Sequence, residues 1–377
     1  MDSRLTTGQP GNPLQAWDAA DRALLAAVDA TCSALAVVGE RWGALVVPLA
    51  DRVRSVLIDS AAGRAALTRN LTTCEASVTD QLRFGDVSEE PDSLGDLASP
   101  EPARWPCGHD GVLMRASPSV ALFDWQLSRL GELAPVGAPV WIAALANQWS
   151  NGHERCVASR LGASRLGASV RSRGVGKARV VQRAIQMALD VPTPWTTIPG
   201  PTGFALASVP GVFCHGRIDP GARSLLAALP SQMAGQRVVD LGCGNGVMGV
   251  EAAARGAAAV IFTDDSLRAL AAARRTWLLA RQSGATARFA HADAGAGLPA
   301  GEADLVICNP PFHQDRAQTL HIVDAMLLAS RRLLRRGGQL VMVGNRHLHH
   351  ESRATSVLSG VKIIHDDGRF SVLRARR

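Results

Sequence analysis

The sequence contains no tyrosine, almost no lysine and no long uncharged apolar run. Lysine occurs only at Lys177 and Lys362, so the positive charge is carried almost entirely by arginine. The most apolar early stretch, residues 24–50, is interrupted by Asp29, Glu40 and Arg41. A membrane-spanning helix needs roughly 20 apolar residues, and the N-terminal residues lack the apolar core of a secretory signal. We therefore expect a cytoplasmic protein with no membrane partner.

The cysteines also lack the spacing of a metal site or a disulfide framework. There are seven of them, at positions 32, 74, 107, 156, 214, 243 and 308, and none forms a C-x-x-C pair. An odd number cannot all pair with one another, and unpaired thiols are typical of a reducing compartment. We predict reduced thiols and no bound metal.

Length and charge indicate two folded domains with an anionic partner. The 377 residues, 47% of them hydrophobic, suffice for two buried cores. A net charge of +7 favours nucleic acid as a partner. The planar donor group of arginine suits phosphates and stacked bases, although a genome-wide base-composition bias would produce the same preference for arginine over lysine.

The second half of the chain alternates strand-like and helix-like segments, as a doubly wound parallel sheet does. Residues 191–210 are rich in proline and glycine, so we predict a linker there, between domains at 1–190 and 211–377. Strands are predicted at Arg237–Leu241, Val260–Thr263, Ala287–His291, Asp304–Cys308 and Gln339–Val343. Residues 361–374 read as an antiparallel hairpin with Asp-Asp-Gly at its turn. The expected α/β fold therefore has seven strands, mostly parallel, ending in this hairpin.

The first half shows the same alternation with weaker signals. Apolar runs near residues 34, 55, 111 and 139 indicate strands, and a helix fits between Ser119 and Leu133. The expected glycine loop is replaced by V-V-G-E-R-W-G, and M-R-A-S-P-S comes after the expected fourth strand. We predict a degenerate copy of the same fold that is structural or docks RNA; an unrelated α/β domain is the alternative.

A basic segment lies near the end of this first half. Residues 155–183 contain eight Lys or Arg residues and no Asp or Glu, with S-R-L-G-A occurring at Ser159 and again at Ser164. Such a run is either a solvated face or a surface that tracks RNA phosphates.

Residues 238–249 read V-V-D-L-G-C-G-N-G-V-M-G, which is a strand, a glycine loop and the start of a helix. Glycines let the backbone approach a ligand closely, and the helix start directs free N–H groups toward it. The pattern G-x-G-x-x-G also fits dinucleotide binding. Asp240 favours S-adenosylmethionine instead, because a carboxylate can hold its amino group. The candidate cofactor residues here are Asp240, Gly242, Cys243, Gly244, Asn245 and Gly246.

Acidic residues come after the next two predicted strands as well. Asp264, or the adjacent Asp265, could accept hydrogen bonds from ribose hydroxyls, and Asp293, beside Ala294, could accept one from the adenine amino group. Each carboxylate alone could simply cap a helix or a loop. Three acids at three successive strand ends favour a nucleoside-containing cofactor.

Residues 307–313, I-C-N-P-P-F-H, indicate methylation of an amine. The lone pair of an exocyclic amine is delocalised into its ring. The side-chain oxygen of Asn309 and the carbonyl of Pro310 could bind its two hydrogens and direct the lone pair toward a methyl donor. Pro311 keeps the loop stiff and Phe312 offers a stacking face. A rigid turn after a strand is the structural alternative.

These motifs resemble those of the class I S-adenosylmethionine-dependent methyltransferases, and within them the ribosomal RNA guanine-N2 methyltransferases. The resemblance lies in F-C-H-G-R-I-D-P-G-A-R from Phe213, in the glycine loop, in N-P-P-F-H-Q, and in G-N-R-H-L from Gly344; L-Q-A-W-D-A-A-D-R-A-L-L from Leu14 is similar to the large-subunit enzymes. It implies tandem Rossmann-like methyltransferase folds, the first degenerate, acting on ribosomal RNA or a ribosomal subunit; we expect a monomer. We expect Phe213 and Asp219 to contact the cofactor, and His313, Arg217, Asn345 and Arg346 to bind the substrate; a capped loop is the alternative for His313, Asn345 and Arg346.

The sequence departs from the family at one motif. Cys214 and His215 stand where Ser-Arg is usual; if an arginine there helps to bind cofactor or RNA, Arg217 or Arg223 must replace it. Two other functions stay open: methylation of adenine N6 or of a protein glutamine, where Asn-Pro-Pro-Tyr is common, and a non-catalytic RNA-binding assembly factor.

Overall fold

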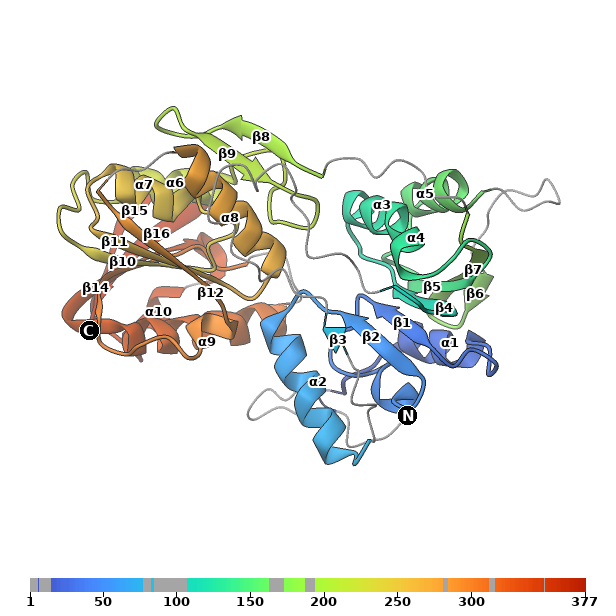
Figure 1. Ribbon diagram of the computed structural model, residues 1–377. Coiled ribbons are helices and arrows are strands. Elements are labelled where there is room, and N and C mark those ends of the chain that lie inside the picture. Colours follow the sequence, from blue (N-terminus) through green and yellow to red (C-terminus); the bar gives the residue numbers. More distant parts are fainter. Residues whose placement is uncertain are drawn as a thin grey trace. The chain divides into compact units, whose positions relative to one another are not determined.

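The computed structural model describes residues 6, 15–76, 83–84, 107–162, 173–186, 194–280, 284–311, 316–348 and 350–377. The chain divides into two compact units, Met1–Pro194 and Trp195–Arg377. In each unit helices cover a twisted sheet (Figure 1). Each sheet has seven strands.

The N-terminal unit builds its sheet in the order β3-β2-β1-β4-β5-β7-β6, with β7 antiparallel to both of its neighbours. Its elements are α1 (Ala19–Ala27), β1 (Leu35–Val38), η1 (Val47–Leu49), β2 (Val53–Leu57), α2 (Ala61–Thr73), β3 (Arg83–Phe84), β4 (Gly111–Arg115), α3 (Val120–Ser128), α4 (Leu130–Leu133), β5 (Pro139–Leu145), α5 (Asn151–Leu161), β6 (Arg173–Val175) and β7 (Ala178–Ala184). The four predicted strands are β1, β2, β4 and β5. The predicted helix at 119–133 is two helices, because the chain leaves the regular helix at Arg129.

The C-terminal unit repeats this order as β12-β11-β10-β13-β14-β16-β15. Its elements are β8 (Thr196–Pro199), β9 (Ala205–Ser208), α6 (Pro220–Ala228), β10 (Arg237–Leu241), α7 (Val247–Ala254), β11 (Ala259–Asp264), α8 (Leu267–Ala280), β12 (Thr286–His291), η3 (Asp293–Gly295), β13 (Ala303–Cys308), α9 (Arg316–Leu333), β14 (Leu334–Asn345), η4 (Arg346–Leu348), α10 (His350–Thr355), β15 (Ser359–Asp366) and β16 (Phe370–Arg376). The mostly parallel sheet and its closing hairpin are confirmed, and the shared strand order rules out an unrelated first fold.

Apolar layers cover both faces of the C-terminal sheet. Val238, Ile307 and Val343 belong to one buried cluster, together with residues of α6, α7 and α8. Val239 and Cys308 belong to another, with residues of α9 and α10. Strands covered on both faces are expected to be apolar at consecutive positions, as these are.

The predicted linker at 191–210 is wrong over most of its length. Residues 196–208 form the hairpin β8–β9, and the Ala207 N–H donates to Thr276 Oγ1 on α8 at 3.0 Å. Leu206 and Ala207 are fully buried. Proline and glycine lie in the turn of this hairpin. Its second strand is held by the contact with α8, a helix that is distant in the sequence.

Candidate functional site

The glycine loop joins β10 to α7 at the carboxyl edge of the sheet. Gly242, Gly244 and Gly246 have φ values of 74°, 54° and 81°, in the left-handed region that favours glycine. The N–H groups of Gly242 and Cys243 donate to the Thr263 carbonyl at 2.9 and 3.1 Å. A Cβ atom on Gly246 would lie 2.9 Å from the Ala273 Cα of α8. The loop is thus held against β11 and α8 and turns tightly into α7.

Asp240 is buried under this loop, with 2% of its surface exposed. Its Oδ2 accepts from the Gly249 N–H at 2.8 Å. Burial raises the pKa of this carboxyl to about 8, the Gly249 N–H opposes the rise, and the charge of Asp264 adds to it. Without a ligand the group is therefore mostly protonated at neutral pH. A cation bound beside it would favour the ionised form.

Asp264 connects the second strand to the glycine loop. Its Oδ2 accepts from the Gly244 N–H and its Oδ1 from the Ser266 N–H, both at 2.9 Å. The carbonyl of the adjacent Asp265 lies 2.8 Å from His291 Nε2 at the end of β12.

Asp293 begins η3 shortly after β12 and is exposed. Surrounding protein and the charge of Asp265 raise the pKa of its carboxyl. The neighbouring Ala294 has φ 43°, unusual for a residue other than glycine. Pairing of Leu241 with Thr263 and of Asp264 with His291 puts Asp240, Asp264 and Asp293 at one edge of three adjacent strands.

Asn309 comes directly after β13, whose Cys308 pairs with Leu241 of β10, so Asn309 lies beside the first glycine of the loop. Its Oδ1 is buried and has no hydrogen-bond partner within the described chain. Pro310 is buried and Pro311 half-buried. Buried polar atoms are almost always satisfied, so Asn309 presents an open acceptor next to the glycine loop. The predicted residues Phe312 and His313 lie outside the described residues.

Asp219 acts as the N-cap of α6, because its Oδ2 accepts from the Ala222 N–H at 3.0 Å. Cys214, with φ 53°, directs its Sγ toward Asp219 Oδ1 at 3.6 Å. Phe213 and Arg217 are exposed. The preceding Val212 packs on Ala272 of α8, and the next residue of that helix, Ala273, lies against Gly246. The segment therefore reaches the helix that backs the glycine loop.

Asn345 ends β14, and its Oδ1 is a second buried acceptor without a partner among the described residues. Arg346 is exposed, with its Nε 3.7 Å from Asp366 Oδ2. His350, which we did not predict from the sequence, is 3% exposed, and neither ring nitrogen has a partner in the described chain. Burial lowers the pKa of His350 to about 4. Its position in H-L-H-H gave no sign of this burial.

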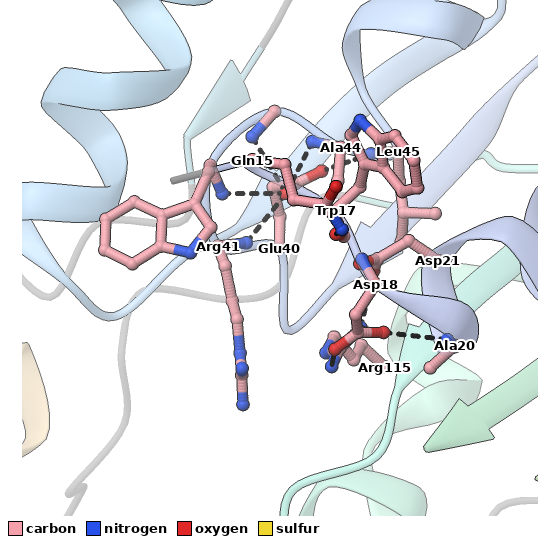
Figure 2. A network of polar contacts seen from close by, with 12 residues as sticks. Gln15, Trp17, Asp18, Ala20, Asp21, Glu40, Arg41, Ala44, Leu45 and Arg115 are labelled. Atoms are coloured by element: carbon pink, nitrogen blue, oxygen red, sulfur yellow. Dashed lines mark hydrogen bonds and ion pairs between the residues drawn. The ribbon is translucent and has the colours of Figure 1, made fainter. Parts of the chain in front are cut away.

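The corresponding loop of the N-terminal unit is occupied by its own glutamate (Figure 2). Glu40 Oε1 accepts from four successive backbone N–H groups, those of residues 41–44, at 2.7–3.2 Å. Its Oε2 accepts from the Leu45 and Val46 N–H groups at 3.0 and 3.1 Å. These donors are therefore not available to a ligand.

Arg115 occupies the N-terminal counterpart of the Asn309 position. In the N-terminal sheet Val38 of β1 pairs with Met114 of β4, and in the C-terminal sheet Leu241 of β10 pairs with Cys308 of β13. Arg115 comes directly after Met114, just as Asn309 comes directly after Cys308. The buried guanidinium forms ion pairs with Asp18 and Asp21 of α1 and its N-cap (Figure 2). The N-terminal unit has no open acceptor at this position, and an internal ion pair takes its place.

Neither a metal centre nor a membrane span is present in the described ranges. Within them, no three His, Cys, Asp or Glu side chains cluster as metal ligands would. None of the helices in those ranges has the length and apolar character needed to cross a bilayer.

Comparison with known proteins identifies the family. Residues 203–374 match the methyltransferase small domain, and residues 3–187 match the RLMG N-terminal domain. The ribosomal RNA large subunit methyltransferase G of Streptomyces coelicolor is 35% identical over 97% of this chain and 95% of its own length. The protein of that name from Pseudomonas aeruginosa PAO1 is 36% identical over 97% of this chain and 95% of its own length.

A solved structure supports the tandem architecture. The T. thermophilus 16S rRNA N2 G1207 methyltransferase, in complex with AdoMet and guanosine, superposes with a TM-score of 0.73. The two sequences are 23% identical, and the superposition covers 96% of this chain and 92% of the neighbour. This similarity establishes the shared fold. The sequence relatives, which match both units from end to end, show that this chain belongs to the ribosomal RNA large subunit methyltransferase G family of S-adenosylmethionine-dependent methyltransferases.

Proposed function

We propose that the chain transfers a methyl group from S-adenosylmethionine to the exocyclic N2 amine of a guanine in large-subunit ribosomal RNA. The observation that carries this proposal is the open acceptor of Asn309, buried at a strand end beside the glycine loop. The names of the relatives support the RNA substrate, and the name of the solved neighbour supports the N2 amine.

The residues at the carboxyl edge fit S-adenosylmethionine, which supplies an electrophilic methyl group when bound. Asp240 would hold the cationic amino group and thereby regain its negative charge. Asp264, or the adjacent Asp265, would accept from a ribose hydroxyl, and Asp293 would accept from the adenine amino group. The other candidate residues would line the cofactor site; they are Gly242, Cys243, Gly244, Asn245, Gly246, Phe213 and Ala294. Asp219 would position the segment that contains Phe213 by capping α6.

Asn309 would act by orienting the amine. Its Oδ1 and the Pro310 carbonyl would accept the two N–H groups of the guanine amine, which directs the nitrogen lone pair at the methyl carbon. Pro310 and Pro311 would limit movement of these acceptors, with Phe312 as the stacking residue. After methyl transfer the surplus proton would leave to water.

The rest of the chain would hold the RNA. His313, Arg217, Asn345 and Arg346 are the candidate substrate residues of the C-terminal unit, and the basic residues of 155–183 those of the N-terminal unit. The N-terminal unit would dock RNA or support the fold without binding cofactor. All candidate catalytic residues lie in one unit, which is consistent with a monomer.

Nucleoside analysis of ribosomal RNA from a deletion strain tests the proposal. We expect the loss of one N2-methylguanine from the large-subunit RNA, located by primer extension, and its return when the intact gene is supplied. Unchanged N2-methylguanine at every position would overturn the proposed function.

A further inference from the structure

Asn345 provides a second unpartnered acceptor at the same edge of the sheet as Asn309. Its Oδ1 is buried, with no hydrogen-bond partner in the part of the chain that the structure describes. An unsatisfied buried acceptor costs roughly 1–3 kcal/mol. A donor from a bound ligand would remove this cost at a position where the protein supplies none.

The two asparagines face the same side of the sheet. Cys308 pairs with Met342, so Asn309 comes next to Val343, two residues before Asn345. Asn345 pairs with Phe370, a member of the same buried cluster as Ile307 and Val343. Alternation along β13 puts Asn309 on this face too. One strand spacing and two residue rises separate the two Cα atoms by about 8 Å, which is within joint reach of one base.

We infer that Asn345 Oδ1 accepts a hydrogen bond from N1–H of the target guanine while Asn309 binds the adjoining N2 amine. This inference rests on the proposed function and adds the means by which guanine is chosen. The N1–H and N2–H groups are neighbouring donors on one edge of guanine. Adenine, cytosine and uracil present no such pair, so two acceptors facing that edge select guanine.

2-Aminopurine is the analogue that probes this contact; because it also lacks the O6 oxygen of guanine, the Asn345 variants identify the part of the preference that comes from N1–H. It carries the same amine at C2 but has no hydrogen on N1, which is an acceptor there. Its N1 would face the Asn345 oxygen and lose the hydrogen bond. An asparagine amide could partly compensate by rotating its NH2 group inward, whereas an aspartate at this position offers only acceptors.

The test measures binding of guanosine and of 2-aminopurine riboside by titration calorimetry, in the presence of S-adenosylhomocysteine. We compare four proteins: the unaltered chain, Asn345→Ala, Asn345→Asp and Asn151→Ala. Asn151 is an exposed asparagine of α5 and serves as the control position. We expect the unaltered chain to prefer guanosine roughly 10- to 100-fold. Asn345→Ala should lose most of this preference, Asn345→Asp should keep or increase it, and Asn151→Ala should match the unaltered chain.

The ratio of the affinities for guanosine and 2-aminopurine riboside distinguishes a lost base contact from a folding defect, because a folding defect would weaken the binding of both ligands alike. An unchanged ratio in Asn345→Ala, or an Asn345→Asp variant that prefers 2-aminopurine riboside, would overturn the inference and leave the proposed function standing. If the unaltered chain binds no guanosine, the inference and the proposed guanine site both fail.

Discussion

At the scale of single residues, the functional candidates are polar atoms buried without full compensation. Asn309 and Asn345 have unpartnered acceptors among the described residues, and Asp240 is forced toward its neutral form by burial. The protein thus carries, in its folded state, an energetic cost that a charged cofactor and a hydrogen-bond donor would relieve. Asn309 was predictable from N-P-P-F, whereas the protonation of Asp240 depends on its depth beneath the loop.

Replacing Asn309 with alanine should reduce methyl transfer by about 10²- to 10³-fold, or roughly 3–4 kcal/mol, because one of the two groups that orient the amine is lost. Affinity for S-adenosylmethionine should change little. Single-turnover transfer of labelled methyl to RNA from the deletion strain measures the first effect, and calorimetry the second. Near-normal turnover in this variant would argue against the assigned site.

Cofactor binding should release protons at pH 7. The Asp240 carboxyl, with a pKa of about 8, is mostly protonated without ligand, and a cationic amino group favours its ionised form. The favourable contribution of Asp240 should therefore rise as the pH increases toward 8. Calorimetry in buffers of different ionisation enthalpy counts the released protons.

Asp240→Asn provides the matched control for this measurement. It keeps the shape of the side chain but has no proton to release, so the buffer dependence should disappear and the affinity should fall. An unaltered chain that binds S-adenosylmethionine at pH 7 with no buffer dependence would contradict the proposed role of Asp240.

At the scale of elements, β14 and α10 are joined by a close contact. The position of a Cβ on Gly344 is 2.2 Å from His350 Cδ2, so only glycine lets the ring lie against this strand. The apolar run of β14 predicted the strand, but neither this packing nor its effect on His350 could be read from local sequence. The same holds for the β8–β9 hairpin, whose strands depend on α8.

His350 should make stability fall in mild acid. Its folded pKa, about 4, is below the ordinary 6.5, so the unfolded chain binds a proton that the folded chain rejects. The contribution of His350 to stability is thus greatest above pH 6.5 and falls as the pH drops toward 4, by about 3 kcal/mol at most. Urea unfolding at pH 7 and pH 5 measures this loss.

His350→Phe should reduce the acid-dependent loss, because the titrating ring is gone. His321→Phe, an exposed position on α9, should retain it. Equal losses in the unaltered chain and the His350 variant would show that other groups govern acid sensitivity.

At the scale of the whole molecule, two sheets share one strand order but carry different residues at the ends of equivalent strands. In the C-terminal unit Asn309, at one of these positions, has an acceptor with no partner among the described residues. In the N-terminal unit Glu40 uses six backbone donors, and Arg115 is neutralised by two aspartates. A degenerate fold was predictable from V-V-G-E-R-W-G; the glutamate that fills its loop was not, because its partners are defined only when the loop closes around it.

We expect one S-adenosylmethionine per chain. Glu40→Ala should leave that stoichiometry and affinity unchanged but destabilise the N-terminal unit by at least about 2–3 kcal/mol, because buried donors lose a charged acceptor. Titration and scanning calorimetry measure the two effects, and Glu40→Gln, which keeps one oxygen, should be intermediate. Binding of two cofactors by the unaltered chain would contradict this prediction.

The sequence by itself determined the strands, the repeated fold and the chemistry of the second unit, because apolar runs, a glycine loop and N-P-P-F act locally. Only the tertiary structure decided which polar atoms stay unpaired, which carboxyl is protonated and which loop is already filled. Those properties depend on burial and on how the chain brings partners together: the Gly249 N–H and the more distant Asp264 for Asp240, the neighbouring strands for Asn309 and Asn345, and two aspartates nearly 100 residues away for Arg115.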